Sequence, residues 1–175
     1  MVANIIEQKI TSASTSVNVV NGIYKKIVEK YPVGTSILDV GCGRYDTNKE
    51  FANKNGFVWF GIDPYNRTSE YNDASLDAMC NYTKYPSIIM LNNVVNVLAE
   101  DNVIMSVLSQ VYNYAGEDTD IYITIYEGDK SGVGKVTTKG YQRNQKVNDY
   151  KDYICEFFEI EEKIGYNIFK CKKVV

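Results

Sequence analysis

Alternation of short apolar segments with helical patterns most constrains what this chain can fold into. The strand-like segments are residues 36–40, 57–62, 87–91 and 121–126. The helix-like segments are residues 17–31, 46–55, 68–82 and 100–114, and in the first and last of these apolar residues recur every three or four positions. Such alternation indicates βαβ units, whose helices cover both faces of a parallel sheet. The sequence therefore predicts an α/β fold, a three-layer αβα sandwich with a mostly parallel sheet.

The C-terminal third predicts a different arrangement. Residues 127–140 are rich in glycine, and we expect a mobile flap there, over the mouth of any site. Residues 147–158 predict a helix, and residues 159–164 and 167–171 predict a closing antiparallel hairpin around Gly165. No linker or repeat divides the chain. We therefore expect one domain over residues 1–175, with residues 1–16 as a loose N-terminal arm.

The composition limits the location and the partners. Hydrophobic residues make up 45% of the chain and charged residues 23%, as in an ordinary globular domain. The net charge of −3 predicts no attraction of the whole protein to nucleic acid. We expect no signal peptide and no membrane span. The cysteines have no C-x-x-C spacing, which favours free thiols and a cytoplasmic location, in a bacterial cell or a host cell.

The chain contains no histidine. This excludes every Ser-His-Asp and Cys-His mechanism and most catalytic zinc sites. A general base would have to be Asp, Glu, Lys, Tyr or Cys. We expect no metal site.

The ends of the predicted strands carry the candidate binding residues. Asp39 precedes a glycine turn formed by Gly41 and Gly43, where a ligand can approach the backbone closely. Asp63 ends the second strand, about 20 residues after the turn, where a carboxylate can accept hydrogen bonds from ribose hydroxyls. The dinucleotide pattern G-x-G-x-x-G fails, because Asp46 stands at its third glycine position. The alternatives are a plain strand–helix turn and a turn-forming aspartate before Pro64.

The stretches ILDVGCG and GIDPYN resemble motifs I and II of the class I methyltransferases, which use S-adenosylmethionine (SAM). The resemblance implies a Rossmann-like fold and SAM as cofactor. It implies that Asp39, Gly41 and Gly43 hold the methionine part. It also implies that Asp63 binds the ribose, and that Pro64 or Tyr65 packs on the adenine. Asn92, at the end of the third predicted strand, is a further candidate for binding SAM.

The resemblance continues through NNVVNVL, IYEGDKSGVGK and KGYQRNQK, which look like small methyltransferase-like proteins of phage and bacteria. The chain departs from the family at Tyr45, where a third glycine is common. The segment between Asp63 and Ser87 is short, so the usual third strand is expected to be missing or vestigial. Asp73 either corresponds to the acidic residue of motif III, which contacts the adenine in the family, or is an ordinary surface residue of a helix.

The third strand end lacks the Pro-Pro-aromatic motif of amino-directed DNA methyltransferases, and the chain has no Pro-Cys nucleophile. Asn93 and Asn96 are candidates to hold the acceptor or the carboxylate of SAM. The alternative is that one of them caps the following helix. Tyr126 and Glu127 end the fourth strand, and either is a candidate base that takes a proton from the acceptor. The alternative for Tyr126 is core packing.

A basic stretch follows, without acidic residues between positions 130 and 146. Its candidate substrate-binding residues are Lys130, Lys135, Tyr141 and Arg143. A flexible basic loop with an aromatic residue can hold a phosphate or a base, so nucleic acid is one candidate acceptor. The alternative is an ordinary solvated loop.

The sequence thus favours an enzyme that transfers a methyl group from SAM to an unidentified nucleic acid, small molecule or protein, with S-adenosylhomocysteine as the other product. One alternative is a non-catalytic, phage-type module that binds SAM or contacts another protein. A second is a SAM-consuming hydrolase or lyase. A nicotinamide oxidoreductase is disfavoured by the glycine spacing.

Overall fold

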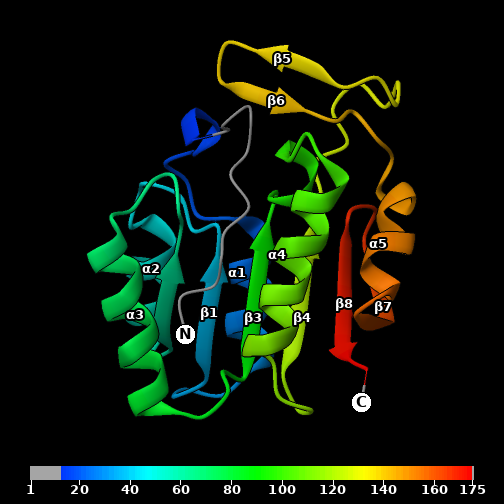
Figure 1. Ribbon diagram of the computed structural model, residues 1–175. Helices are drawn as coiled ribbons and strands as arrows, with labels where there is room; N and C mark the ends of the chain where they lie inside the picture. Colours follow the sequence, from blue (N-terminus) through cyan, green and yellow to red (C-terminus); the bar gives the residue numbers. More distant parts are fainter. Residues whose placement is uncertain (1–12, 175) are drawn as a thin grey trace.

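The computed structural model describes residues 13–174, and a six-stranded sheet forms its centre (Figure 1). The order across the sheet is β2-β1-β3-β4-β8-β7. The strands are β1 (Ser36–Val40), β2 (Val58–Ile62), β3 (Ile88–Asn92), β4 (Asp120–Thr124), β7 (Phe158–Ile164) and β8 (Ile168–Lys173). The first four are parallel, and β8 runs antiparallel to both β4 and β7. This confirms the mostly parallel sheet with a C-terminal antiparallel hairpin.

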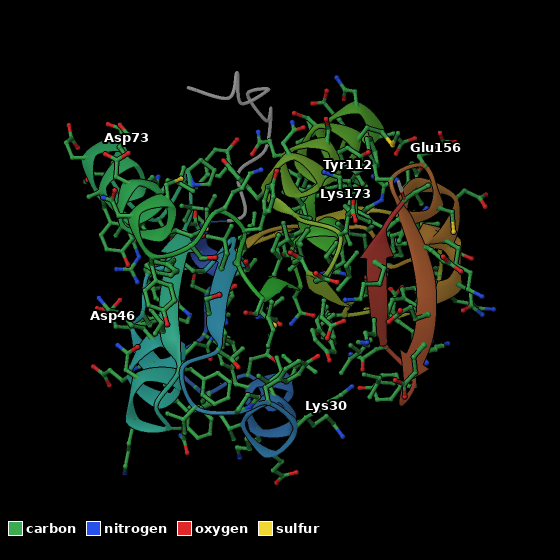
Figure 2. All side chains as sticks on the ribbon, turned by 90° about the horizontal axis from the view of Figure 1, so that it is seen from below. Lys30, Asp46, Asp73, Tyr112, Glu156 and Lys173 are labelled. Atoms are coloured by element: carbon green, nitrogen blue, oxygen red, sulfur yellow. The ribbon has the colours of Figure 1, made fainter. Side chains whose placement is uncertain are left out.

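Helices cover both faces of the sheet, as Figure 2 shows from below. The helices are α1 (Gly22–Lys30), α2 (Thr47–Lys54), α3 (Ser69–Tyr82), α4 (Asp101–Tyr114) and α5 (Lys151–Cys155). Helices α1 and α2 share one apolar cluster with one face of the sheet, and α3, α4 and α5 share a second cluster with the other. The strands β1 and β3 are buried on both faces, and their residues are mostly apolar; Ser36, Asp39 and Asn92 are the polar positions.

Two helices begin or end at other residues than the sequence predicts. The helix expected over residues 17–31 begins only at Gly22, because the Asn21 side chain accepts a hydrogen bond from Ile23 N and caps it. The helix expected over residues 147–158 consists of η3 (Val147–Tyr150) and α5. It ends early because Phe158, buried in the core, is already the first residue of β7.

The connection from β2 to β3 passes through α3 alone. Strand β2 lies at one edge of the sheet, and residues 13–174 contain no strand that pairs with its outer side. The prediction that the third strand of the family is missing is therefore confirmed for the described residues. As a consequence, α3 lies on the same face of the sheet as α4.

The segment expected to be an irregular flap contains a hairpin of β5 (Lys135–Thr137) and β6 (Gly140–Gln142). It lies beyond the carboxyl ends of the parallel strands (Figure 1). Strand β6 contacts two short 3₁₀ turns, η1 (Ala13–Thr15) and η2 (Val95–Val97). Of the expected N-terminal arm, residues 1–12 lie outside the described residues. No helix of residues 13–174 is both long and apolar enough to cross a membrane.

Candidate functional site

A cavity of about 900 Å³ lies at the carboxyl ends of β1, β2, β3 and β4. Ligands of open α/β sheets bind at this edge, and the volume is within the range of small-molecule sites. The predicted site residues that line it are Asp39, Gly41, Gly43, Asp63, Pro64, Tyr65, Asn92, Asn93, Tyr126, Lys135 and Tyr141. The structure thus brings together residues from four strand ends and the hairpin.

The glycine turn after β1 needs glycine at both positions. Gly41 and Gly43 have φ values of +79° and +74°, which side chains with a Cβ rarely adopt. A Cβ on Gly41 would also lie 2.5 Å from the Val94 side chain, and one on Gly43 would lie 2.9 Å from Ser16 Oγ. The turn is held by hydrogen bonds from Gly41 N and Cys42 N to Ile62 O. Its backbone is therefore open to the cavity and closely packed elsewhere.

Asp63 organises the loop after β2. Its Oδ2 accepts hydrogen bonds from Gly43 N at 2.9 Å and Asn66 Nδ2 at 3.1 Å. Its Oδ1 accepts from Tyr65 N at 2.9 Å and Asn66 N at 2.8 Å. These bonds use about four acceptor positions, which is the capacity of a carboxylate. Asp63 therefore joins the glycine turn to its own loop, and the turn-forming alternative describes its geometry well.

The side chain of Asp39 has fewer hydrogen-bond partners than that of Asp63. It is buried, and its Oδ2 accepts a hydrogen bond from Tyr24 Oη at 2.6 Å. Its Oδ1 has no hydrogen-bond partner among the described residues. The pKa of Asp39 is raised to about 6, mainly by burial and also by the charge of Asp63, and the hydrogen bond from Tyr24 opposes this rise. The cavity wall thus includes a buried carboxylate that is only partly hydrogen-bonded, and its Oδ1 is shielded from solvent in the ligand-free protein.

Three asparagines at the end of β3 and after it line the cavity, but their environments differ. Asn92 lines the cavity, and its Nδ2 is buried without a hydrogen-bond partner among residues 13–174. Asn93 lines the cavity with a φ of +57°. Asn96 is buried and donates from Nδ2 to Gln142 Oε1 at 3.2 Å. Neither Asn93 nor Asn96 caps α4, whose N-cap is Glu100, so that alternative was wrong.

The two candidate bases after β4 point in different directions. The Tyr126 side chain lines the cavity and is 60% exposed, so its core-packing alternative was wrong. Glu127 is not part of the cavity wall. Its Oε1 accepts from Val147 N at 2.8 Å, and its Oε2 pairs with Lys130 Nζ at 2.8 Å, which lowers the pKa of Glu127. Glu127 therefore stabilises the loop that carries it.

The basic stretch is largely neutralised by its neighbours. Lys130 pairs with Glu127, and Lys135 Nζ pairs with Asp129 Oδ2 at 2.7 Å. Arg143 is buried outside the cavity wall, where its guanidinium contacts Leu98 O, Ala99 O, Gln145 Oε1 and Asp101 Oδ1. Of the four predicted substrate-binding residues, Lys135 and Tyr141 line the cavity, and Lys130 and Arg143 do not.

Sequence reasoning missed one wall of the cavity. This wall is apolar and comes from α3, the loop after β3, and α4; its side chains are Leu76, Val94, Leu98, Val103, Val107 and Tyr114. Asp73 of α3, labelled in Figure 2, also lines the cavity. Of these residues, Val103 and Val107 belong to the apolar pattern by which the sequence predicts the helix over residues 100–114. Only the positions of α3 and α4 on the same face of the sheet expose them to a common cavity.

The thiols and carboxylates provide no further reactive group. Cys42 lines the cavity, but burial raises its pKa well above the usual range, so it stays protonated. Within residues 13–174, no group of three or more Cys, Asp or Glu side chains could hold a metal ion.

Comparison with known proteins gives a consistent fold. No protein-family model and no curated protein sequence matches the chain. A TehB-like SAM-dependent methyltransferase from Corynebacterium glutamicum is 18% identical, with a TM-score of 0.57 and 89% of each chain covered. A SAM-dependent methyltransferase from Clostridium acetobutylicum is 13% identical, with a TM-score of 0.58, covering 96% of this chain and 92% of that one.

A third similar structure, a SAM-dependent methyltransferase from Methanosarcina mazei, is 12% identical, with a TM-score of 0.61. The match covers 89% of this chain and 99% of that one. At these identities the likeness concerns the fold. Together with the sheet order and the glycine turn at the end of β1, it shows that the chain has the Rossmann-like α/β fold of the class I SAM-dependent methyltransferases.

Proposed function

We propose that the cavity binds SAM and that the chain transfers its methyl group to an acceptor. The observation that carries this proposal is the environment of Asp39. A buried carboxylate with one oxygen unpartnered lies on the cavity wall, immediately before the glycine turn. Such a group is stabilised by a cationic ligand. SAM carries an ammonium group and a sulfonium group.

The distribution of charge favours SAM over a dinucleotide. Among the described residues, the charged side chains that line the cavity are Asp39, Asp63, Asp73, Asp129, Lys135 and Lys139. Both lysines belong to the hairpin, so the charged side chains of the cavity wall nearest the glycine turn are Asp39 and Asp63. Arg67 donates to Gly43 O at 2.8 Å but does not line the cavity. A pyrophosphate at the turn would be repelled by Asp39 and Asp63, whereas an ammonium group would be attracted.

The proposed roles follow from position. Asp39 attracts the ammonium group of the methionine part, and Asn92 Nδ2 is the proposed donor to the carboxylate of that part. Gly41 and Gly43 provide backbone that the ligand can approach closely. Asp63 receives the ribose, for which the Asn66 side chain has to release Oδ2. Pro64, Tyr65 and the apolar wall from α3 and α4 receive the adenine, since that wall offers contacts to a flat apolar ring.

Bound SAM supplies a methyl group on a good leaving group, so the protein needs only to orient the acceptor and exclude water. Asn93 and Tyr126 line the cavity, and we assign them to the acceptor, together with Lys135 and Tyr141. We assign no role at the acceptor to Glu127, Lys130 or Arg143, whose side chains are engaged outside the cavity.

The mouth of the cavity favours a narrow acceptor. Strand β6 reaches η1 across it, and two of the four predicted substrate-binding residues are engaged away from the cavity. A small molecule, a protein side chain or a single flipped base is therefore proposed in place of an intact duplex.

The test is transfer of radiolabelled methyl from SAM to separated DNA, RNA, protein and small-molecule fractions of a cell extract. We expect label in one fraction, and loss of that label in the Asp39→Asn variant. Binding of SAM without transfer to any fraction would overturn the enzyme proposal in favour of a SAM-binding interaction module. Breakdown of SAM without an acceptor would overturn it in favour of a hydrolase or lyase.

A further inference from the structure

A buried chain of three side chains leads to the cavity from the opposite layer. Trp59 of β2 donates from Nε1 to Tyr24 Oη at 2.9 Å, and Tyr24 of α1 donates to Asp39 Oδ2 at 2.6 Å. Tyr24 is completely buried, and Trp59 is 8% exposed. Neither Tyr24 nor Trp59 lines the cavity, so neither can touch a ligand there.

The direction of these hydrogen bonds is fixed by chemistry. An indole nitrogen can only donate, so Tyr24 Oη accepts from Trp59 and must direct its single proton to Asp39. Oδ2 of Asp39 is therefore always an acceptor. If Asp39 becomes protonated, its proton has to be on Oδ1, the oxygen without a partner.

We propose that Tyr24, held by Trp59, is a positioning residue for SAM. It holds Asp39 in place behind the cavity wall and favours its ionised form, whose negative charge attracts the ammonium group. This inference rests on the proposed function of the cavity. It goes beyond it by making SAM binding depend on a residue that the ligand never contacts. It also makes binding depend on pH, because protonation of Asp39 would remove the negative charge that attracts the ammonium group.

Each group that faces Asp39 has a defined effect on it. The charge of Asp63, at the end of β2, raises the pKa of Asp39, and the amides of Asn92 and Asn48 lower it. Cys42 of the turn and Tyr71 of α3 have raised pKa values and stay neutral. Tyr24 has a raised pKa for the same reason, burial, and remains a donor. The hydrogen bond from Tyr24 is thus the main interaction that favours ionised Asp39.

The first test needs no ligand. The variant Tyr24→Phe keeps the ring and removes the donor. We expect the pKa of Asp39, measured by carboxyl ¹³C NMR of the ligand-free protein, to rise from about 6 by about one pH unit, the worth of one charged hydrogen bond. The variant Trp59→Phe should move it in the same direction by less. An unchanged Asp39 pKa in both variants would overturn the inference.

A matched control is Tyr31→Phe. Tyr31 is the C-cap of α1, and its hydroxyl also donates to a carboxylate, that of Asp120. Asp120 is the first residue of β4, so it lies at the amino ends of the parallel strands, away from the cavity at their carboxyl ends. The control removes a similar hydrogen bond from the same helix and should leave the pKa of Asp39 unchanged. An equal shift of the Asp39 pKa in Tyr31→Phe would mean that loss of any buried hydrogen bond of this helix changes the pKa, and it would contradict the inference.

The second test measures SAM affinity by calorimetry across pH. A one-unit rise in the Asp39 pKa leaves about a tenth of the side chain ionised at pH 6, where half of it is ionised in the unmodified protein. Tyr24→Phe should therefore weaken SAM about fivefold at pH 6 and less than twofold at pH 8. Equal weakening at both pH values would contradict the inference. Absence of SAM binding by the unmodified protein would instead refute the proposed function, and the NMR result would still stand.

Discussion

Asp39 and Asp63 are both buried at the ends of neighbouring strands, but the protein stabilises their charges very differently. Asp63 accepts four hydrogen bonds from the turn and its own loop. Asp39 accepts one within 3.5 Å, and its Oδ1 has no partner among the described residues. Because burial raises its pKa from 3.8 to about 6, the folded protein holds this proton more tightly than the unfolded chain does. Asp39 therefore lowers the stability of the ligand-free protein as pH rises from 4 to 6.

We expect Asp39→Asn to stabilise the ligand-free protein at pH 7 by about 2 to 3 kcal/mol, because an amide removes the buried charge and still accepts from Tyr24. The pH dependence of stability between 4 and 6 should decrease, while SAM binding is lost. Urea denaturation at pH 4 and pH 7 measures both effects.

The control for this prediction is Asp63→Asn, the same change at a carboxylate that is fully hydrogen-bonded. It should destabilise the protein, because one oxygen acceptor is replaced by a donor that faces other donors. Destabilisation of similar size in Asp39→Asn would contradict the account of Asp39.

The sequence indicated which residues gather at the site better than what they contact. Strand ends and glycine spacing predicted Asp39, Gly41, Gly43 and Asp63, all of which line the cavity. The Tyr24–Asp39 contact was not predictable, because it depends on how α1 packs beneath the sheet. The burial of Arg143 was not predictable either, because its charge is compensated by carbonyl groups more than 40 residues away in sequence.

At the scale of elements, the β5–β6 hairpin is tied down at its base. Gln142 Nε2 donates to Tyr126 O at 3.0 Å, Asn144 Nδ2 donates to Val133 O at 2.9 Å, and Arg143 joins the base to the start of α4. The strands themselves are exposed or half-exposed. Their residues therefore lack the alternation of buried and exposed side chains that signals a strand, which is why the sequence predicted only a flap.

We expect Arg143→Ala to lower the free energy of unfolding by about 2 kcal/mol, because a buried guanidinium and its hydrogen bonds are lost. Lys139→Ala removes the same charge from the turn of the hairpin and is the matched control. Chemical denaturation compares them. Equal stability of Arg143→Ala and Lys139→Ala would show that Arg143 does not anchor the hairpin.

The four parallel strands and most helices were predictable, because their apolar residues repeat with the periods of buried strands and amphipathic helices. Their ends were less predictable. The expected strand 121–126 ends at Thr124, since Tyr126 is already in the cavity wall. The expected helix at 17–31 shortened because Asn21 caps it in place of an earlier residue.

At the scale of the whole molecule, the direct connection from β2 to β3 shapes the cavity. Because no strand follows β2 at its edge within residues 13–174, α3 returns across the sheet and lies on the face that α4 also covers. Leu76 of α3 and Val107 of α4 then line the same cavity. The short segment after Asp63 indicated the missing strand, but the resulting apolar wall required the three-dimensional arrangement.

The measurement that tests the central claim most directly is calorimetric titration of the protein with SAM, S-adenosylhomocysteine and NADH. Gly43→Ala and Gly34→Ala provide a matched pair, since both glycines have positive φ. Gly34 precedes β1, so it lies at the end of the sheet away from the cavity. The account predicts one site for SAM and S-adenosylhomocysteine with a Kd on the order of micromolar, no heat with NADH, and weakened SAM binding in Gly43→Ala alone. No binding of SAM or S-adenosylhomocysteine, or equal binding of NADH, would contradict it.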